Sequence, residues 1–235
     1  MVLRSIYDKE RELVSYNYFD IASGVGYEIF FGTSNDGTTR IVTEKVYSGM
    51  IHKNGAEVAL ALQNTEYEVF DIDFDIKFNK PRNIKGFIMM QIPFGLSNKD
   101  FGTVGFTYKI TGQAFHVTSG GSETQIGSDV TGEYINIAAL GVGNPSSHTS
   151  TLAIDGSASV THFKPDETLR FTIKMTAKTD SGANKKIIGG MGCDPQNRSD
   201  FKHELDSNVA ADEAQTIETD KPSRMEFHVP FVIPV

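Results

Sequence analysis

The sequence predicts an all-β protein, an antiparallel β-sandwich of jelly-roll type. Three observations predict this fold class. Apolar residues recur at every second position in several segments, and turn sequences such as Asn-Gly and Asp-Gly separate those segments. Helical patterns long enough for the crossovers of a parallel sheet are missing. About ten short strands joined by such turns are typical of a sandwich or a barrel.

The clearest strand is the segment 169–177, in which every odd position is apolar and the even positions are Arg, Thr or Lys. One face of such a strand packs against a core and the other meets water. The segment 225–235 repeats the scheme, with apolar residues at its odd positions. Both segments therefore predict half-buried strands.

The remaining expected strands follow from the same test. The near-continuous apolar run 86–92 predicts a central strand that is covered on both faces. The pair Thr111-Gly112 interrupts an alternating pattern and predicts a break between two short strands. The Gly-rich segment 189–192 predicts a bulge, a turn or a close strand approach. The polar segment 141–150 predicts a loop. Further strands are expected at 27–31, 38–47, 70–78, 106–110, 115–117, 135–140 and 151–160.

Two domain-level expectations follow. Residues 1–25 predict an N-terminal arm or a short helix, because charged residues favour a helix there but the apolar stripe is poor. Residues 26–235 are expected to form a single β-sandwich domain, since neither an internal repeat nor a linker composition divides them. Within that range, residues 200–220 hold seven acidic side chains and one Lys, which predicts a long acidic excursion.

The charge balance argues against a nucleic-acid partner. Lys and Arg number 22 and Asp and Glu number 30, so the formal net charge is −8. A phosphate backbone is repelled by such a surface unless a basic patch overrides it. The densest basic pair, Lys185-Lys186, predicts only a hairpin tip. No run of about 18 apolar residues occurs, so we expect synthesis in a cytoplasm and no membrane partner reached through a cleaved or spanning segment.

The sharpest candidate for a cation site is Asp71, Asp73 and Asp75. Three carboxylates at alternate positions are typical of the start of a calcium loop, but Ile76 stands where that loop needs a glycine. On a strand, alternate residues lie on one face roughly 6.5–7 Å apart, too far for neighbours to hold one ion tightly. We favour a solvated strand face that is neutralised by Lys or Arg on a neighbouring strand.

Catalytic and metal-binding motifs are missing from the sequence. The histidines do not show the short spacings of a zinc motif, and we expect His116 and His228 to lie on the polar faces of their strands. The nucleophile elbow G-x-S-x-G does not occur. The single cysteine, Cys193, lies beside Asp194 at a turn, which favours a structural thiol over a nucleophile. We therefore expect no catalytic residues, no metal, no cofactor and no enzymatic activity. The six histidines whose spacing was compared with zinc motifs are His52, His116, His148, His162, His203 and His228.

Aromatic residues offer a further candidate site. The chain lacks Trp but has 16 Phe and 8 Tyr, and exposed aromatic rings can form a platform for sugars. The candidates are Tyr16, Tyr18, Tyr67 and Tyr134. We favour the alternative that these rings lie at strand ends or between subunits.

A family resemblance rests on two stretches, 106–127 (FTYKITGQAFHVTSGGSETQIG) and 163–177 (FKPDETLRFTIKMTA), with the turn 194–198 and the strand 227–231. Together they resemble jelly-roll proteins of phage and viral particles, including capsid decoration proteins. The resemblance implies a structural protein of the virion that stabilises or decorates the capsid. It also implies a capsid or other virion protein as partner and a homo-oligomer, commonly a homotrimer. A glycan- or receptor-binding module of lectin-like type is the alternative.

Overall fold

The structure is a computed structural model that describes residues 25–34, 40–43, 52–100, 102–198 and 222–232. Within these ranges it contains strands and turns and no helix. The expected N-terminal arm or helix lies outside the described residues, apart from its last position, and so does the acidic segment 200–220.

Fifteen strands make up the described fold. In chain order they are β1 (Val25–Ser34), β2 (Arg40–Thr43), β3 (His52–Leu60), β4 (Tyr67–Lys77), β5 (Arg82–Ile84), β6 (Phe87–Asn98), β7 (Val104–Val117), β8 (Glu123–Gln125), β9 (Val130–Thr131), β10 (Ile135–Leu140), β11 (Pro145–Asp155), β12 (Thr161–Phe163), β13 (Thr168–Thr179), β14 (Lys185–Gly192) and β15 (Met225–Val232).

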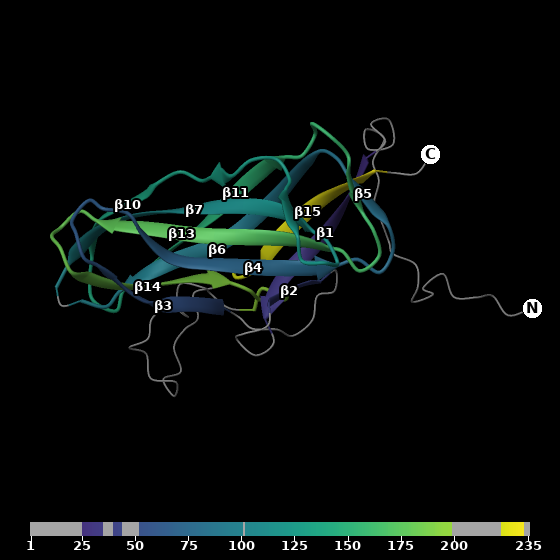
Figure 1. Cartoon of the computed structure of the whole chain (residues 1–235). Coiled ribbons are helices and arrows are strands. Elements are labelled where there is room, and N and C mark those ends of the chain that lie inside the picture. The colour runs from purple at the N-terminus through teal and green to yellow at the C-terminus, as the bar shows by residue number, and fades with distance from the viewer. Residues whose placement is uncertain (1–24, 35–39, 44–51, 101, 199–221, 233–235) are drawn as a thin grey trace, which may run out of the picture.

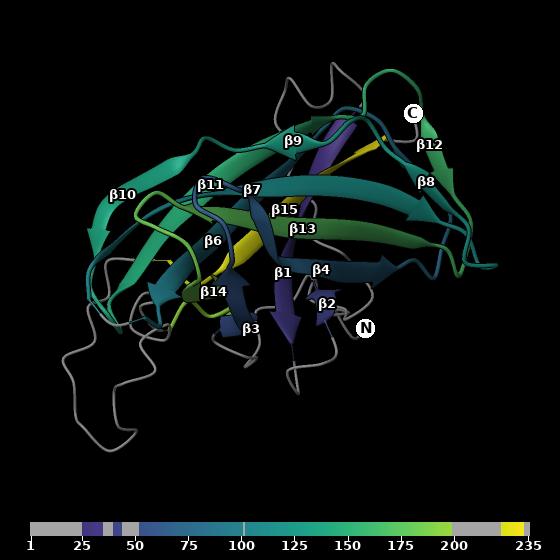
Figure 2. The same ribbon diagram turned by 60° about the vertical axis from the view of Figure 1, so that its left-hand side comes forward.

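The strands form two packed layers, which confirms the predicted antiparallel β-sandwich. The front layer has the order β10-β7-β13-β4, and its long strands run side by side across Figure 1. The second layer is built around β6, which pairs with β11 along one edge and with β15 and β14 along the other. Strand β1 lies beyond β15, and β3 lies beyond β14. Figure 2 shows the second layer running obliquely behind the first.

Alternation along the strands places the core between the layers. In β13, Phe171, Ile173 and Met175 are fully buried, while Arg170 and Lys174 point to the outer face. The buried residues of β4 and β15 follow the same period. The pattern that predicted these strands is therefore the pattern of inward and outward side chains.

Aromatic rings connect the two layers. Phe227 of β15 stacks on Phe171 of β13, with ring centroids 4.3 Å apart and planes inclined by 14°. Phe74 of β4 packs on the same Phe227 ring at 6.0 Å. Towards the other end of the sandwich, Phe94 of β6 meets Tyr108 of β7 edge-on at 5.7 Å. Offset and edge-on aromatic pairs of this kind add about 0.5–1.5 kcal/mol each beyond their burial.

The predicted break at Thr111-Gly112 is wrong. Strand β7 continues through both residues and pairs with β13 along its length. Gly112 points into the core, where a Cβ would overlap Met90 Cε of the opposite layer. The glycine therefore lets the two layers approach and does not end a strand. Because the strand keeps its period, Phe115 lies on the outer face and His116 on the inner one, so the expectation of a polar-face His116 is also wrong.

The predicted loop at 141–150 is wrong in its second half. Residues 145–155 form β11, and its residues 145–150 pair with residues 92–97 of β6. Among the described strands, β11 pairs only with β6, so this edge strand is held by backbone hydrogen bonds and needs little apolar alternation. The prediction that 86–92 is covered on both faces also needs correction, because Phe87 is 50% exposed and Met89 is half-buried.

The Gly-rich segment 189–192 belongs to β14 and is a close strand approach, as predicted. A Cβ on Gly192 would lie 2.5 Å from the Ser223 carbonyl oxygen and 2.8 Å from Pro93 Cγ. Neither neighbour can rotate away, since one is backbone and the other is a ring. The register shift between Ile188 and Gly190 marks a bulge in the same strand.

We therefore expect the substitution Gly192→Ala to lower the free energy of unfolding by about 1–3 kcal/mol, the usual cost of overpacking. Gly120→Ala is the matched control, because the nearest atom to a Cβ there is Thr118 Oγ1 at 3.9 Å. Urea unfolding of both variants measures the difference. Equal stability of the two variants would contradict the proposed close approach.

Candidate binding surfaces

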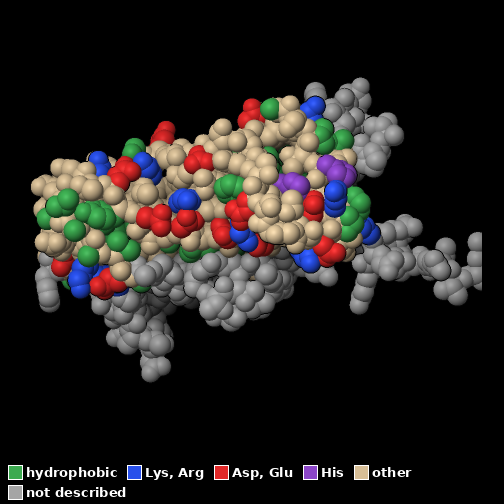
Figure 3. Space-filling model, in the orientation of Figure 1, with side chains coloured by type: hydrophobic (Ala, Val, Ile, Leu, Met, Phe, Trp, Pro, Cys, Tyr) green, Lys and Arg blue, Asp and Glu red, His purple; other side chains and the backbone are tan. Residues whose placement is uncertain are grey.

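The outer face of the front layer carries a ladder of charges (Figure 3). Asp71, Asp73 and Asp75 of β4 face basic residues of β13. Asp71 Oδ2 lies 2.8 Å from Lys174 Nζ, and Asp75 accepts two hydrogen bonds from the Arg170 guanidinium, at 2.8 and 2.7 Å. The hydrogen bonds that these basic groups donate to the aspartates raise the pKa of Arg170 and of Lys174. The predicted face neutralised by neighbouring basic residues is confirmed.

Other polar groups of β13 complete this ladder. Thr172 Oγ1 donates a hydrogen bond of 2.6 Å to Asp73, and Arg170 Nη1 lies 2.6 Å from Glu123 of β8. Each of the three aspartates thus has at least one donor from the chain itself. Among the described residues, no group of His, Cys, Asp and Glu is arranged to hold a metal ion.

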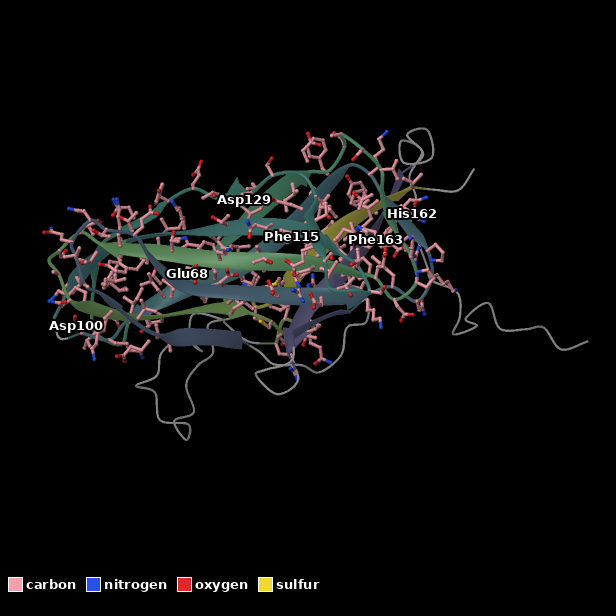
Figure 4. The ribbon with its side chains drawn as sticks, in the orientation of Figure 1. Glu68, Asp100, Phe115, Asp129, His162 and Phe163 are labelled. Carbon is pink, nitrogen blue, oxygen red and sulfur yellow. The ribbon has the colours of Figure 1, made fainter. Side chains whose placement is uncertain are left out.

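Amide side chains extend the same face. Asp129 accepts hydrogen bonds from Gln113 Nε2 at 2.8 Å and from Gln125 Nε2 at 2.6 Å. Figure 4 labels Asp129, which lies between β8 and β9, together with Glu68 of β4 and Phe115 of β7. Phe115 is only half-buried, since it lies on the outer face among polar neighbours.

The basic pair of the sequence lies at the start of β14, directly after the turn that contains Asn184. Lys186 Nζ lies 3.1 Å from a Glu57 oxygen, and Lys185 Nζ lies 4.0 Å from Asp100. Acidic partners therefore offset both charges. The pair does not form the isolated basic patch that binding to a phosphate backbone requires.

An exposed tyrosine cluster lies at the end of the front layer where β13 ends and β10 begins. The cluster consists of Tyr134, Glu66, Lys109 and Lys178. Tyr134 is 53% exposed, and its hydroxyl donates a hydrogen bond of 2.7 Å to Glu66. Lys109 Nζ donates to the same hydroxyl at 2.6 Å and lies 3.0 Å from the Glu66 carboxylate. Lys178 Nζ lies 5.9 Å from the centre of the ring.

Electrostatics fix the charged state of this cluster. Hydrogen bonds from Tyr134 and Lys109 lower the pKa of Glu66. The hydrogen bond to Tyr134 raises the pKa of Lys109, and Glu66 raises it further. Both groups are therefore ionised at neutral pH. The sequence offered no signal for the partners of Tyr134, because positions 66, 109 and 178 are far from it in the chain.

The other tyrosine candidates do not offer an exposed ring within the described residues. Tyr67 is half-buried, and its hydroxyl accepts a hydrogen bond of 3.0 Å from the backbone N–H of Leu62. Tyr16 and Tyr18 lie outside the described residues. Hydrophobic side chains gather at this end of the face in Figure 3. Leu62 is 60% exposed, so the apolar surface near the start of β4 extends beyond Tyr67.

A histidine and a glutamate meet at the opposite end of the layer. His116 Nε2 lies 2.7 Å from Glu167 Oε2, and the backbone N–H of Lys164 donates to the same oxygen at 2.7 Å. The His116 ring also packs edge-on against Phe163, at 4.5 Å between centroids. These contacts tie the end of β7 to the turn that precedes β13.

The remaining described histidines have separate partners. His162, labelled with Phe163 in Figure 4, contacts Asn83, and His228 lies 3.0 Å from Glu226. His148 Nε2 lies 3.4 Å from Ser146 Oγ. His228 is on the outer face, as predicted. The side chain of His52 and all of His203 lie outside the described residues.

Cys193 is fully buried, and its thiol lies 3.7 Å from the Met191 carbonyl oxygen. The neighbouring Asp194 is also buried and accepts hydrogen bonds from the backbone N–H groups of Gln196 and Arg198. Its ion pair with the Arg198 guanidinium is 3.0 Å long. The carboxylate therefore organises the turn, in agreement with a structural role for this segment.

A second surface lies on the outer face of the second layer. One row of residues runs in register across four strands of this layer. It consists of Ala153 of β11, Met89 of β6, His228 of β15 and Ile29 of β1. Phe87, two residues before Met89 on the same face, is 50% exposed, and Ile29 is 44% exposed. We name Phe87, Met89, Ala153 and Ile29 the outer strip. Periodicity alone does not reveal this strip, because the near-continuous apolar run 86–92 is equally compatible with a strand that is covered on both faces.

Comparisons with known proteins complete this description. No protein-family model and no curated protein matches the sequence. The fold is similar to a CocE/NonD family hydrolase from Staphylococcus aureus, with 12% identity and a TM-score of 0.37, over 71% of this chain and 37% of that one. It is also similar to an α-amino acid ester hydrolase, with 8% identity and a TM-score of 0.38, over 86% of this chain and 36% of that one.

A further match is the VP2 subviral particle of infectious bursal disease virus, with 7% identity and a TM-score of 0.25. That match covers 85% of this chain and 40% of the viral chain. The chain thus spans well under half the length of these solved structures. Within the described ranges, no helix is long and apolar enough to cross a membrane.

These matches overturn the expectation that the chain is not an enzyme, because two of the similar structures are hydrolases. That expectation rested on missing sequence motifs, and such motifs do not test groups that folding brings together from distant positions. We therefore withdraw it. At these identities and TM-scores, the likeness assigns no activity to this chain.

The His116–Glu167 contact predicts a pH dependence of stability. The hydrogen bond from the Lys164 N–H lowers the pKa of Glu167, and His116 lowers it further. A carboxylate with a lowered folded-state pKa contributes stability above its unfolded pKa, near 4.5, and loses it as the pH falls through the folded value. We expect Glu167→Gln to be less stable than the wild type at pH 6.5.

The difference between the two proteins should shrink as the pH falls from 6.5 to 3, because the unfolded chain takes up a proton at Glu167 before the folded protein does. Urea unfolding at both pH values measures it. Asp166→Asn is the control, because the ion pair of Asp166 with Lys77 is well exposed to solvent. A difference that stays constant between the two pH values would contradict the assigned role of the carboxylate.

Proposed function

We propose that the chain is a structural protein of a virus particle, which stabilises or decorates the capsid and associates with other copies of itself through the outer strip. The observation that carries the proposal is the outer strip, whose apolar residues come from β11, β6 and β1, with His228 of β15 between Met89 and Ile29. The virion setting, and the trimer as the expected oligomer, come from the sequence resemblance. The proposed partners are further copies of the chain and a capsid protein.

The chemistry of the outer strip supports association. Large side chains such as Phe and Met are enriched where protein surfaces meet. Burying the exposed parts of Phe87 and Ile29 contributes on the order of 1 kcal/mol for each side chain. A particle repeats this contribution at every copy, so that modest contacts add up to a stable lattice.

The charges beside the strip support the same use. Glu226 lies 2.7 Å from Arg224 and 3.0 Å from His228 on the outer face of β15. Because these groups are paired with one another, a partner that covers them removes water from an ion pair and does not bury an unpaired charge. Unpaired buried charges are what most often oppose association.

We expect light scattering coupled to gel filtration, at micromolar concentration, to report an oligomer, with a trimer mass as the specific expectation. The double variant Phe87→Asp with Ile29→Asp should weaken association at least about tenfold, equivalent to about 1.4 kcal/mol. Leu62→Asp is the matched control, since Leu62 is 60% exposed but lies outside the strip. Circular dichroism and thermal unfolding check that each variant is folded.

Concentrating the wild-type protein about 100-fold above the micromolar range favours association by roughly 2.7 kcal/mol. If it is still a monomer there, the proposed self-association is wrong. An oligomer that survives the double variant but not Leu62→Asp would move the interface to the tyrosine end of the front layer.

A further inference from the structure

We propose that the tyrosine cluster is a saccharide-binding site in which a sugar ring packs on the exposed face of Tyr134. This site is distinct from the outer strip and does not depend on the proposed assembly. It lies on the front layer, whereas the strip lies on the outer face of the second layer.

The ring of Tyr134 is held in position before any ligand arrives. Its hydroxyl donates to Glu66 at 2.7 Å and accepts from Lys109 at 2.6 Å. Lys109 is itself anchored to Glu66 at 3.0 Å. These three mutual contacts fix the far end of a side chain that is 53% exposed. A preorganised ring loses little conformational entropy on binding, which is the main advantage of tyrosine at recognition surfaces.

The face of the ring remains accessible. Lys109 Nζ is 2.6 Å from the hydroxyl but 4.4 Å from the ring centre, so it lies towards the hydroxyl edge. Lys178 Nζ is farther away, at 5.9 Å from the centre. An aromatic face offers a flat apolar surface, and a pyranose ring presents a matching patch of C–H groups.

Polar groups around the ring match the hydroxyls of a sugar. An ammonium group such as that of Lys178 supplies three donors, and the ionised carboxylate of Glu66 can accept more hydrogen bonds than the two it has. The side chain of Glu66 is 39% exposed, so a ligand can reach it. A flat apolar surface beside a few fixed donors and acceptors is the usual composition of a small-molecule site.

Charge narrows the choice of ligand. Two ammonium groups beside the ring repel a quaternary ammonium ligand, which would otherwise favour an aromatic face. The net charge of −8 opposes a polyanionic nucleic acid. A saccharide that is neutral or carries a single carboxylate is neither a cation nor a polyanion, so neither repulsion opposes its binding. The groups come from separate segments of the chain, namely the start of β4, β7, the start of β10 and β13.

The test is a glycan array probed with the labelled full-length chain, followed by NMR titration with each saccharide that binds. We expect binding to at least one saccharide, with Tyr134→Ala weakening it at least tenfold. Tyr134→Phe keeps the ring but loses both hydrogen bonds of the hydroxyl. Its affinity for the saccharide should lie between the affinities of the wild type and of Tyr134→Ala. Lys178→Met should weaken binding without affecting thermal unfolding.

Phe87→Ala is the matched control, because it removes an aromatic ring of nearly equal exposure from the other layer. It should leave saccharide binding unchanged while weakening self-association, and Tyr134→Ala should do the reverse. The two proposals can therefore fail separately. Silence on the array, binding that Tyr134→Ala does not alter, or a response to mononucleotides without one to saccharides would each overturn the saccharide site.

Discussion

The packing of Phe227 between the two layers is the interaction on which the rest of the structure depends. Its ring stacks on Phe171 and meets Phe74, so one side chain of β15 is in contact with two strands of the opposite sheet. Burial of this aromatic core fixes the distance between the layers. With that distance fixed, the outer faces are rigid surfaces whose side chains keep a constant spacing.

The two outer faces use this rigidity differently. On the front layer, each aspartate of β4 finds a partner on β13, and the charges neutralise one another within the sheet. Such exposed pairs contribute little to stability individually, but they keep the face soluble and leave Tyr134 as a distinctive aromatic feature at its end. The second layer instead presents Phe87 and Ile29 to its surroundings. One face thus suits small-ligand recognition and the other suits contact between proteins.

Sequence periodicity predicted the strands in which one face is apolar and the other polar, such as 169–177 and 225–232. It failed where the physical cause lies in another strand. Gly112 is needed because Met90 of the opposite layer occupies its space, so the glycine did not mark the end of β7. Residues 145–150 are held by backbone hydrogen bonds to β6, and their side chains give no sign of it.

The candidate sites were predictable only in part, for the same reason. The pairing of Asp71, Asp73 and Asp75 with basic residues could be predicted, since a run of carboxylates on a strand needs neighbouring cations. The partners of Tyr134 could not, because Glu66, Lys109 and Lys178 meet it only after the strands have paired.

The position of β15 has a consequence for synthesis. This strand comes late in the sequence, yet it lies inside the second layer, between β1 on one side and β6 on the other. During translation, β1 and β6 emerge long before the strand that joins them, so the layer cannot close until β15 has left the ribosome. Contacts of such large sequence separation form slowly, and until they form the unpaired backbone edge of β6 is open to other chains. The nascent protein therefore has a long period in which a chaperone, or a neighbouring copy that supplies its own β15, can occupy that edge.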